Sequence, residues 1–193
     1  MILARHGESE FSARGLVNGD PGVAGGLTPA GVEQAHALGR ALAEEELDLC
    51  VTSAFQRVRE TADLALAGRN VPRVILDDLG DPNYGVYEGG PLDDYREWTT
   101  AHPSGAAPDG GESRIELVTR YTRSFRIVLA RSERRILVVG HSIAIAYLLG
   151  AREGTPPAPC APVVVYATPY PFTRAELERS VEALEAWCAV PTW

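Results

Sequence analysis

Two short apolar segments, residues 2–4 and 136–139, each stand two positions before a histidine, His6 and His141. Continuous apolar runs of this length are typical of buried parallel strands. Strand and helix signals alternate along the rest of the chain, which predicts an α/β fold with a mostly parallel sheet. Ligands bind in open α/β sheets where the carboxyl ends of parallel strands meet. The two histidines are therefore expected to share one pocket.

The composition predicts a single domain over residues 1–193, because a chain of this length with 45% apolar residues can bury one sizeable core. The net charge of −8 argues against a nucleic acid or a membrane as partner. Three cysteines without a CxxC pair predict neither a disulfide framework nor a zinc site and favour a reduced cytoplasm. No apolar run has the length of a membrane span, and Arg5 interrupts any early leader. Nothing in the sequence indicates the oligomeric state.

Local signals predict the remaining elements. We expect a polar loop at 9–26, followed by a helix that starts at Thr28 and Pro29. Further strands are expected at 48–52, 74–76 and 163–166, the last being the fifth strand. Further helices are expected after the cap Ser53, at 91–98, from Ser113 to about residue 130, at 143–149, and after the cap Thr173 at the end of the chain.

Arginines near the first histidine indicate the ligand. All 18 basic residues are arginines, and Arg5 directly precedes His6. Arg57 lies one turn into its predicted helix, on the same face as Thr61. A guanidinium group is a rigid, permanently charged fork of donors that fits phosphate oxygens. The sequence therefore predicts a site for a phosphoryl group.

Several blocks in this order and spacing resemble the histidine phosphatase superfamily, to which the phosphoglycerate mutases belong. The matching residues are Arg5-His6-Gly7-Glu8-Ser9, Leu27-Thr28 with Gly31 and Gln34-Ala35, Ser53, Arg57, Thr61-Ala62, Gly85, Glu88-Gly89, Gly111-Glu112-Ser113 and Gly140-His141-Ser142. The resemblance covers residues 1 to about 150. It implies a three-layer α/β fold of the phosphoglycerate mutase type, with helices on both faces of the sheet.

The resemblance also implies roles for individual residues. His6 corresponds to the nucleophile, which becomes a phosphohistidine that water then hydrolyses. Arg5, Arg57 and His141 correspond to donors around the phosphoryl oxygens. Ser142 opens a helix, so its backbone amide is expected to join them.

Two further positions and the general acid depart from the usual family residues. Ser12 stands where the family usually has Asn, and Asn18 precedes Gly19 at a position usually held by Gln; both are expected to contact the substrate phosphate. Asp81 stands four residues before Gly85, where the family has the Glu that protonates the leaving group. An aspartate is one methylene shorter, so Glu88 and Asp78 remain alternatives as the acid.

A phosphatase is favoured over a mutase within this family. Mutases have a longer insertion between the acid and the second histidine, with lysine and paired arginines. In this chain His141 stands 60 positions after Asp81, there is no lysine, and the one Arg-Arg pair, Arg134-Arg135, comes directly before a strand. We expect a phosphomonoesterase acting on a small soluble phosphate ester, without a cofactor or a metal. The alternatives are mutase-type phosphoryl transfer and a non-catalytic phosphate-binding module, which the Glu to Asp change motivates. The first strand is not followed by GxGxxG, which argues against a nucleotide-dependent oxidoreductase.

The region at about 83–112 is expected to form a lid that reads the leaving group. Its aromatic residues Tyr84, Tyr87, Tyr95 and Trp98 suit a wall of the substrate pocket and suit equally well the packing of the lid on the domain.

Overall fold

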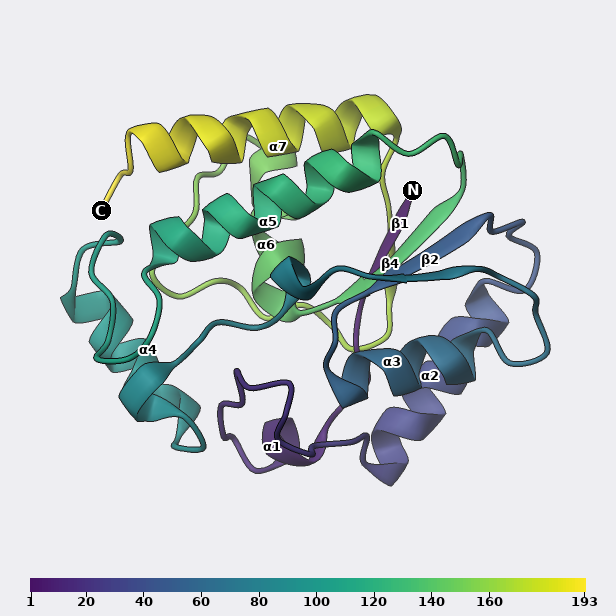
Figure 1. Ribbon diagram of the computed structural model, residues 1–193, viewed down its shortest axis with the longest axis horizontal. Coiled ribbons are helices and arrows are strands. Elements are labelled where there is room, and N and C mark those ends of the chain that lie inside the picture. Colours follow the sequence, from purple (N-terminus) through teal and green to yellow (C-terminus); the bar gives the residue numbers. More distant parts are fainter.

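A five-stranded sheet forms the centre of the computed structural model, which describes residues 1–193 (Figure 1). The strand order is β3-β2-β4-β1-β5; the first four strands are parallel, and β5 is antiparallel to β1. The strands are β1 (Ile2–Arg5), β2 (Leu49–Thr52), β3 (Arg73–Ile75), β4 (Ile136–Gly140) and β5 (Pro169–Pro171). The prediction of a mostly parallel α/β sheet is confirmed.

Helices cover both faces of this sheet (Figure 1). They are α1 (Glu10–Ala13), α2 (Pro29–Ala41), α3 (Gln56–Ala65), α4 (Leu92–Ala101), α5 (Arg114–Leu129), α6 (Ser142–Arg152) and α7 (Arg174–Ala189), with short 3-10 turns η1 (Asp77–Leu79) and η2 (Gly85–Tyr87). The segment 83–112 connects η1 to α5 and carries η2 and α4. None of the helices combines the length and the apolar character needed to span a bilayer.

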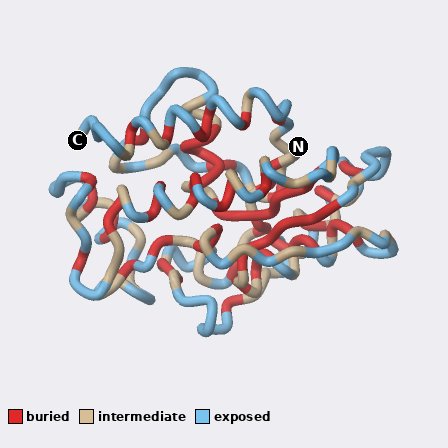
Figure 2. The backbone as a smooth tube through the Cα atoms, turned by 45° about the horizontal axis from the view of Figure 1, so that its top comes forward, coloured by how far each residue is buried: buried red, intermediate tan, exposed pale blue.

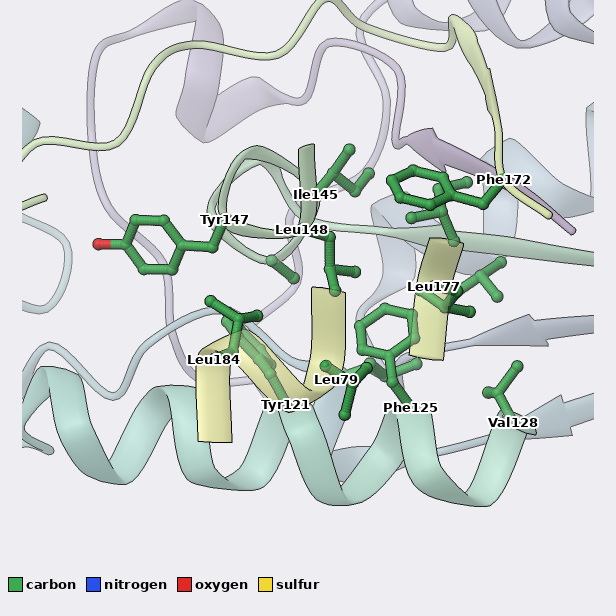
Figure 3. Close-up of a cluster of buried hydrophobic side chains, with 14 of the residues drawn as sticks. Leu79, Tyr121, Phe125, Val128, Ile145, Tyr147, Leu148, Phe172, Leu177 and Leu184 are labelled. Carbon is green, nitrogen blue, oxygen red and sulfur yellow. The ribbon is translucent and has the colours of Figure 1, made fainter. Parts of the chain in front are cut away.

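Alternating side chains of the strands divide the core into two layers, because successive residues of a strand point to opposite faces. Leu3 packs with the cluster formed by α5, α6 and α7, whereas its neighbour Ala4 packs with the cluster under α2 and α3. The strands β2 and β4 are buried along their whole length, at the centre of the molecule (Figure 2). In the larger cluster, Tyr121 and Phe125 of α5 face residues of α6 and α7 such as Leu148 (Figure 3). The predicted three-layer arrangement is confirmed.

The predicted helix starts are set by local capping. Thr28 accepts a hydrogen bond from the Gly31 amide at the start of α2, with Pro29 at the first helical position. Ser113 forms a reciprocal capping box with Glu116 at the start of α5. These short-range hydrogen bonds explain why the boundaries of α2 and α5 follow from the sequence.

Three predicted elements are wrong. The loop at 9–26 contains the short helix α1, capped by the Ser9 hydroxyl. The N-cap of α3 is Phe55, which offers no capping side chain, while Ser53 bonds elsewhere. The fifth strand is not 163–166 but β5, at the edge of the sheet beside β1. Its two prolines fit there because an edge strand leaves one side without partners and a proline has no N–H to donate.

Candidate active site

The two histidines that follow β1 and β4 lie side by side. Arg5 stands opposite Gly140 in the parallel register, and the backbone amide of His6 donates a hydrogen bond of 3.0 Å to the Gly140 carbonyl. The ring centroids of His6 and His141 are 5.3 Å apart, in an edge-on arrangement. Both residues are buried, with exposed fractions of 3% and 0%. Neighbouring strands thus bring together two imidazoles that are distant in the sequence.

The hydrogen bond of His6 determines which ring nitrogen carries its proton. Nδ1 lies 2.7 Å from the Gly7 carbonyl oxygen, which can only accept, so Nδ1 holds the proton and Nε2 keeps its lone pair. Burial lowers the pKa of His6 well below its usual value, and the positive charges of Arg57 and Arg5 lower it further. His6 is therefore a neutral imidazole with a free nucleophilic Nε2 at neutral pH.

His141 is held from two sides. Its Nε2 is 2.9 Å from the Ser53 hydroxyl, and its Nδ1 is 3.1 Å from Oδ2 of Asp81. Burial lowers the pKa of His141, although the Asp81 carboxylate opposes this effect. The Nδ1 side of His141 therefore faces the same carboxylate oxygen as Arg57.

Arg57 is buried on α3, and both of its terminal nitrogens donate hydrogen bonds. Its Nη1 donates to Asn18 Oδ1 at 2.6 Å, and its Nη2 donates to the Asn18 carbonyl at 3.0 Å and to Asp81 Oδ2 at 2.8 Å. The Thr61 hydroxyl donates to the Arg57 carbonyl at 2.7 Å and accepts from the Gly7 amide at 3.0 Å. Thr61 therefore ties α3 to the loop that carries the first histidine.

Arg5 and Ser142 are fixed by the segment that follows α6. Arg5 donates to the Val164 carbonyl at 2.8 Å and lies over the Tyr166 ring at 3.7 Å, while its buried Nε has no partner. The Ser142 hydroxyl accepts from the Val164 amide at 3.1 Å. Residues 163–166 thus form a wall of the site rather than a strand, and sequence reasoning missed Tyr166 because a ring that covers an arginine leaves no spacing signal.

Ser12 belongs to the short helix α1. Its hydroxyl lies 2.8 Å from the hydroxyl of Ser9, the N-cap of that helix. Both serines line the same cavity as His6 and Asn18. All eight residues singled out by the sequence are near this cavity; seven of them line it, and His141 contacts Asp81 and His6 from behind.

Asp81 points into the cluster of histidines and arginines. Burial of the carboxyl raises its pKa, but His141 and Arg57 more than offset this effect, so the pKa lies well below its usual value. In the free site Asp81 is consequently an anion paired with the same groups that would receive a phosphate.

The two alternative acids lie outside the cavity lining. Glu88 accepts hydrogen bonds from the backbone amides of Gly19 at 2.9 Å and Tyr84 at 3.0 Å. Asp78 pairs with Arg123 on the surface. Both carboxylates hold loops in place, which leaves Asp81 as the carboxyl group that faces the histidines.

Arg120 of α5 holds the loop that presents Asp81, a role that sequence reasoning missed. It donates to the backbone carbonyls of Asp78 at 2.7 Å, Gly80 at 2.8 Å and Asp81 at 2.8 Å, and it pairs with Glu112 at 2.6 Å. Because the acceptors are backbone carbonyls far away in the sequence, no side-chain pattern marks this contact.

The histidines and Asp81 also offer the ligand types of a metal-ion site. Ligand atoms of His6, Asp81 and His141 lie within 4.8 Å of one another. Arg57 donates to the same carboxylate, however, and Arg5 flanks the first histidine. Two fixed positive charges favour an anion over a cation at this position.

A cavity of about 300 Å³ opens from these groups toward the segment 83–112. Tyr84 and Tyr95 line it and also pack on each other edge to face, at 4.6 Å between ring centroids. Tyr87 and Trp98 pack against Tyr95 and are not part of the lining. Tyr84 and Tyr95 thus form part of the pocket wall, whereas Tyr87 and Trp98 pack the segment 83–112 together.

Comparisons with known proteins agree with this geometry. The sequence pattern of the histidine phosphatase superfamily (branch 1) matches residues 1–188. A 2,3-bisphosphoglycerate-dependent phosphoglycerate mutase of Methylobacterium sp. is 33% identical over 175 residues, covering 80% of each chain. An adenosylcobalamin/alpha-ribazole phosphatase of Salmonella typhimurium is 32% identical over 165 residues, covering 81% of this chain and 80% of its own.

Solved structures show the same fold. The alpha-ribazole phosphatase from Shigella flexneri superimposes with a TM-score of 0.71 at 28% identity, covering 80% of each chain. Bacillus stearothermophilus YhfR superimposes with a TM-score of 0.75 at 27% identity, covering 87% of each chain. The protein belongs to the histidine phosphatase superfamily. Members similar to it are phosphatases and phosphoglycerate mutases, so phosphoryl-transfer chemistry is the activity class of this site.

Proposed function

We propose that the protein hydrolyses a small phosphate monoester through a phosphohistidine on Nε2 of His6. The observation that carries this proposal is the buried, neutral His6, whose Nδ1 proton is held by the Gly7 carbonyl while Arg5 and Arg57 flank the ring. A neutral imidazole attacks phosphorus without a separate base, and the arginines stabilise the charge on the phosphoryl oxygens.

In the first step Nε2 of His6 forms a bond to phosphorus while the bond from phosphorus to the ester oxygen breaks. Arg5, Arg57 and His141 bind the phosphoryl oxygens, with Ser12, Asn18 and the backbone amide of Ser142 at the edge of the cradle. A dianionic phosphoryl group takes over Arg57 from Asp81 and adds a negative charge beside the carboxyl. Both effects raise the pKa of Asp81, so it binds a proton and can donate it to the departing alkoxide.

In the second step water attacks the phosphohistidine. The Asp81 carboxylate accepts a proton from this water, the bond between phosphorus and Nε2 breaks, and inorganic phosphate forms. When phosphate leaves, Arg57 pairs with Asp81 again and the carboxyl releases this proton to solvent, which replaces the proton taken up before the first step. The site returns to neutral His6 and anionic Asp81, so the net reaction is ester plus water to alcohol plus phosphate. No metal or other cofactor enters either step.

Hydrolysis is favoured over transfer to a second hydroxyl group. The Arg134-Arg135 pair lies outside the cavity lining; both backbone amides donate to Asp48, and Arg135 pairs with Glu46. The paired arginines that a mutase would use are thus absent from the pocket.

We also propose that residues 83–112 form a lid within one domain. This segment is joined to the loop after β1 by backbone hydrogen bonds, from Val17 to Gly90 at 3.0 Å and from Leu92 to Gly15 at 2.8 Å. It supplies Tyr84, Leu92 and Tyr95 to the cavity. The leaving group of the substrate would therefore lie between the lid and the phosphoryl site.

The test is phosphate release from aryl, sugar, glycerate and nucleotide monoesters by the wild type and by His6→Ala. We expect turnover by the wild type, none by His6→Ala, and an acid-labile, base-stable phosphoryl label on the quenched wild type. Turnover that survives in His6→Ala would refute the phosphohistidine. Phosphate binding without turnover of any ester would favour the non-catalytic module.

A further inference from the structure

Arg114, the first residue of α5, is a buried cation without an anion. Only 7% of the residue is exposed, yet Nε and Nη1 have no hydrogen-bond partner. Its single hydrogen bond runs from Nη2 to the Pro159 carbonyl at 3.3 Å. The other buried arginine, Arg57, differs because it pairs with Asp81 at 2.8 Å, and the partly buried Arg120 pairs with Glu112 at 2.6 Å.

The surroundings compensate this charge only in part. The rings of Tyr95 and Tyr147 lie 5.9 Å from the Arg114 guanidinium carbon, at the outer limit of a cation–π contact. Buried charges are normally paired, because an unpaired one loses its hydration without a replacement. A guanidinium left with two free donors is therefore matched to an acceptor that the chain does not provide.

The cavity supplies the route to such an acceptor. Arg114 lines the same cavity of about 300 Å³ as His6, together with Tyr84, Leu92 and Tyr95. Arg96 lines it as well, but its side chain is 39% exposed and pairs with Asp93. Since the net charge of the chain is −8, the cation at the leaving-group end is a local feature and not part of a generally basic surface.

We propose that Arg114 binds a second anionic group, a carboxylate or a phosphate, on the leaving group of the substrate. This inference rests on the proposed function, since it assumes that the ester phosphate occupies the His6 end of the cavity. Arg114 is then a specificity-determining residue: its two free donors form charge-assisted hydrogen bonds, which discriminate strongly against a neutral analogue.

Matched pairs of esters test this inference. 4-Carboxyphenyl phosphate is compared with 4-carbamoylphenyl phosphate, 3-phosphoglycerate with glycerol 3-phosphate, and fructose 1,6-bisphosphate with fructose 6-phosphate. In the wild type we expect kcat/KM to be about 10- to 100-fold higher for the charged member of at least one pair, the range that one hydrogen bond to a charged group supports. The first two pairs report a carboxylate and the third a second phosphate.

Variants then test whether Arg114 causes the preference for the charged ester. Arg114→Gln should reduce the charged-to-neutral ratio to about one, and Arg114→Lys, which keeps the charge but loses the fork, should give an intermediate ratio. Arg126→Gln is the matched control, because Arg126 lies on the same helix and pairs with Glu185 outside the cavity. It should keep the wild-type ratio.

The outcomes separate the two proposals. A wild-type ratio near one for all pairs overturns the inference while leaving the proposed function intact, and it does so even if no Arg114 variant folds. A preference that persists in Arg114→Gln also overturns it. Turnover of no ester at all, including 4-nitrophenyl phosphate, overturns the proposed function and this inference with it.

Discussion

We predict that Asp81 competes with phosphate for the free site, so its removal should separate binding from catalysis. Its carboxylate accepts from Arg57 at 2.8 Å and lies 3.1 Å from Nδ1 of His141. Asp81→Asn keeps the size of the side chain and removes its charge. Inorganic phosphate should then bind more tightly, while turnover of esters that need a proton donor should fall.

Asp81→Asn should increase the affinity for phosphate and decrease kcat, and the size of each change can be worked out. A hydrogen bond to a charged group contributes about 1.5–3 kcal/mol, so freeing Arg57 should lower the Kd for phosphate about 10- to 100-fold. Loss of the general acid should reduce kcat for an alkyl phosphate about 10²- to 10⁴-fold. An activated aryl phosphate needs little protonation of its leaving group and should lose much less.

Calorimetric titration with phosphate and steady-state kinetics on glycerol 3-phosphate and 4-nitrophenyl phosphate measure these effects. Asp78→Asn is the control, because Asp78 lies nearby but pairs with Arg123 on the surface. Unchanged or weaker phosphate binding in Asp81→Asn would refute the competition, and full turnover of the alkyl ester would remove Asp81 as the acid.

Three further predictions concern stability. Ser53→Ala removes the partner of His141 Nε2 and should lower the free energy of unfolding by about 1–3 kcal/mol in urea titrations, whereas an unchanged value would show that the hydroxyl is not needed. Arg114→Met removes an unpaired buried charge and should raise the free energy of unfolding by about 1–3 kcal/mol, with a Tm increase of about 2–10 °C by calorimetry; a lower Tm would contradict this. The pKa of His6 is lowered in the folded state, so the unfolded chain binds more protons below about pH 6.5 and stability should decrease as the pH falls from there. The decrease is limited to about 1.4 kcal/mol per pH unit from this residue, and urea titrations at pH 7, 6 and 5 should show a shallower decrease in His6→Gln; equal slopes would exclude the effect.

The sheet and most helices could be predicted because their determinants are local. Apolar runs mark β2 and β4, and single capping side chains such as Thr28 and Ser113 mark helix starts. The fifth strand could not be placed, because 163–166 and β5 are both short and apolar and only the pairing with β1 distinguishes them.

The same distinction applies to the site. His6, His141 and Arg57 could be located because strand ends and a helix start position them. Ser53, Arg120 and Tyr166 act through contacts with residues distant in the sequence, so their roles follow only from the folded chain. Arg114 is similar: its position after a capping serine looks like an ordinary helix start until its burial is known.

The hydroxyl of Thr61 couples one end of the cavity mechanically to the central sheet, while loops form the other end. By joining the Gly7 amide to the Arg57 carbonyl, it ties the segment that carries His6 to the helix that carries Arg57. The far wall of the cavity comes instead from 83–114 and 159–166, which reach the sheet through loops. Under the proposed function, substitutions at lining positions such as Leu92 and Thr99 should therefore change which alcohol is released without disturbing the contacts of His6 and Arg57.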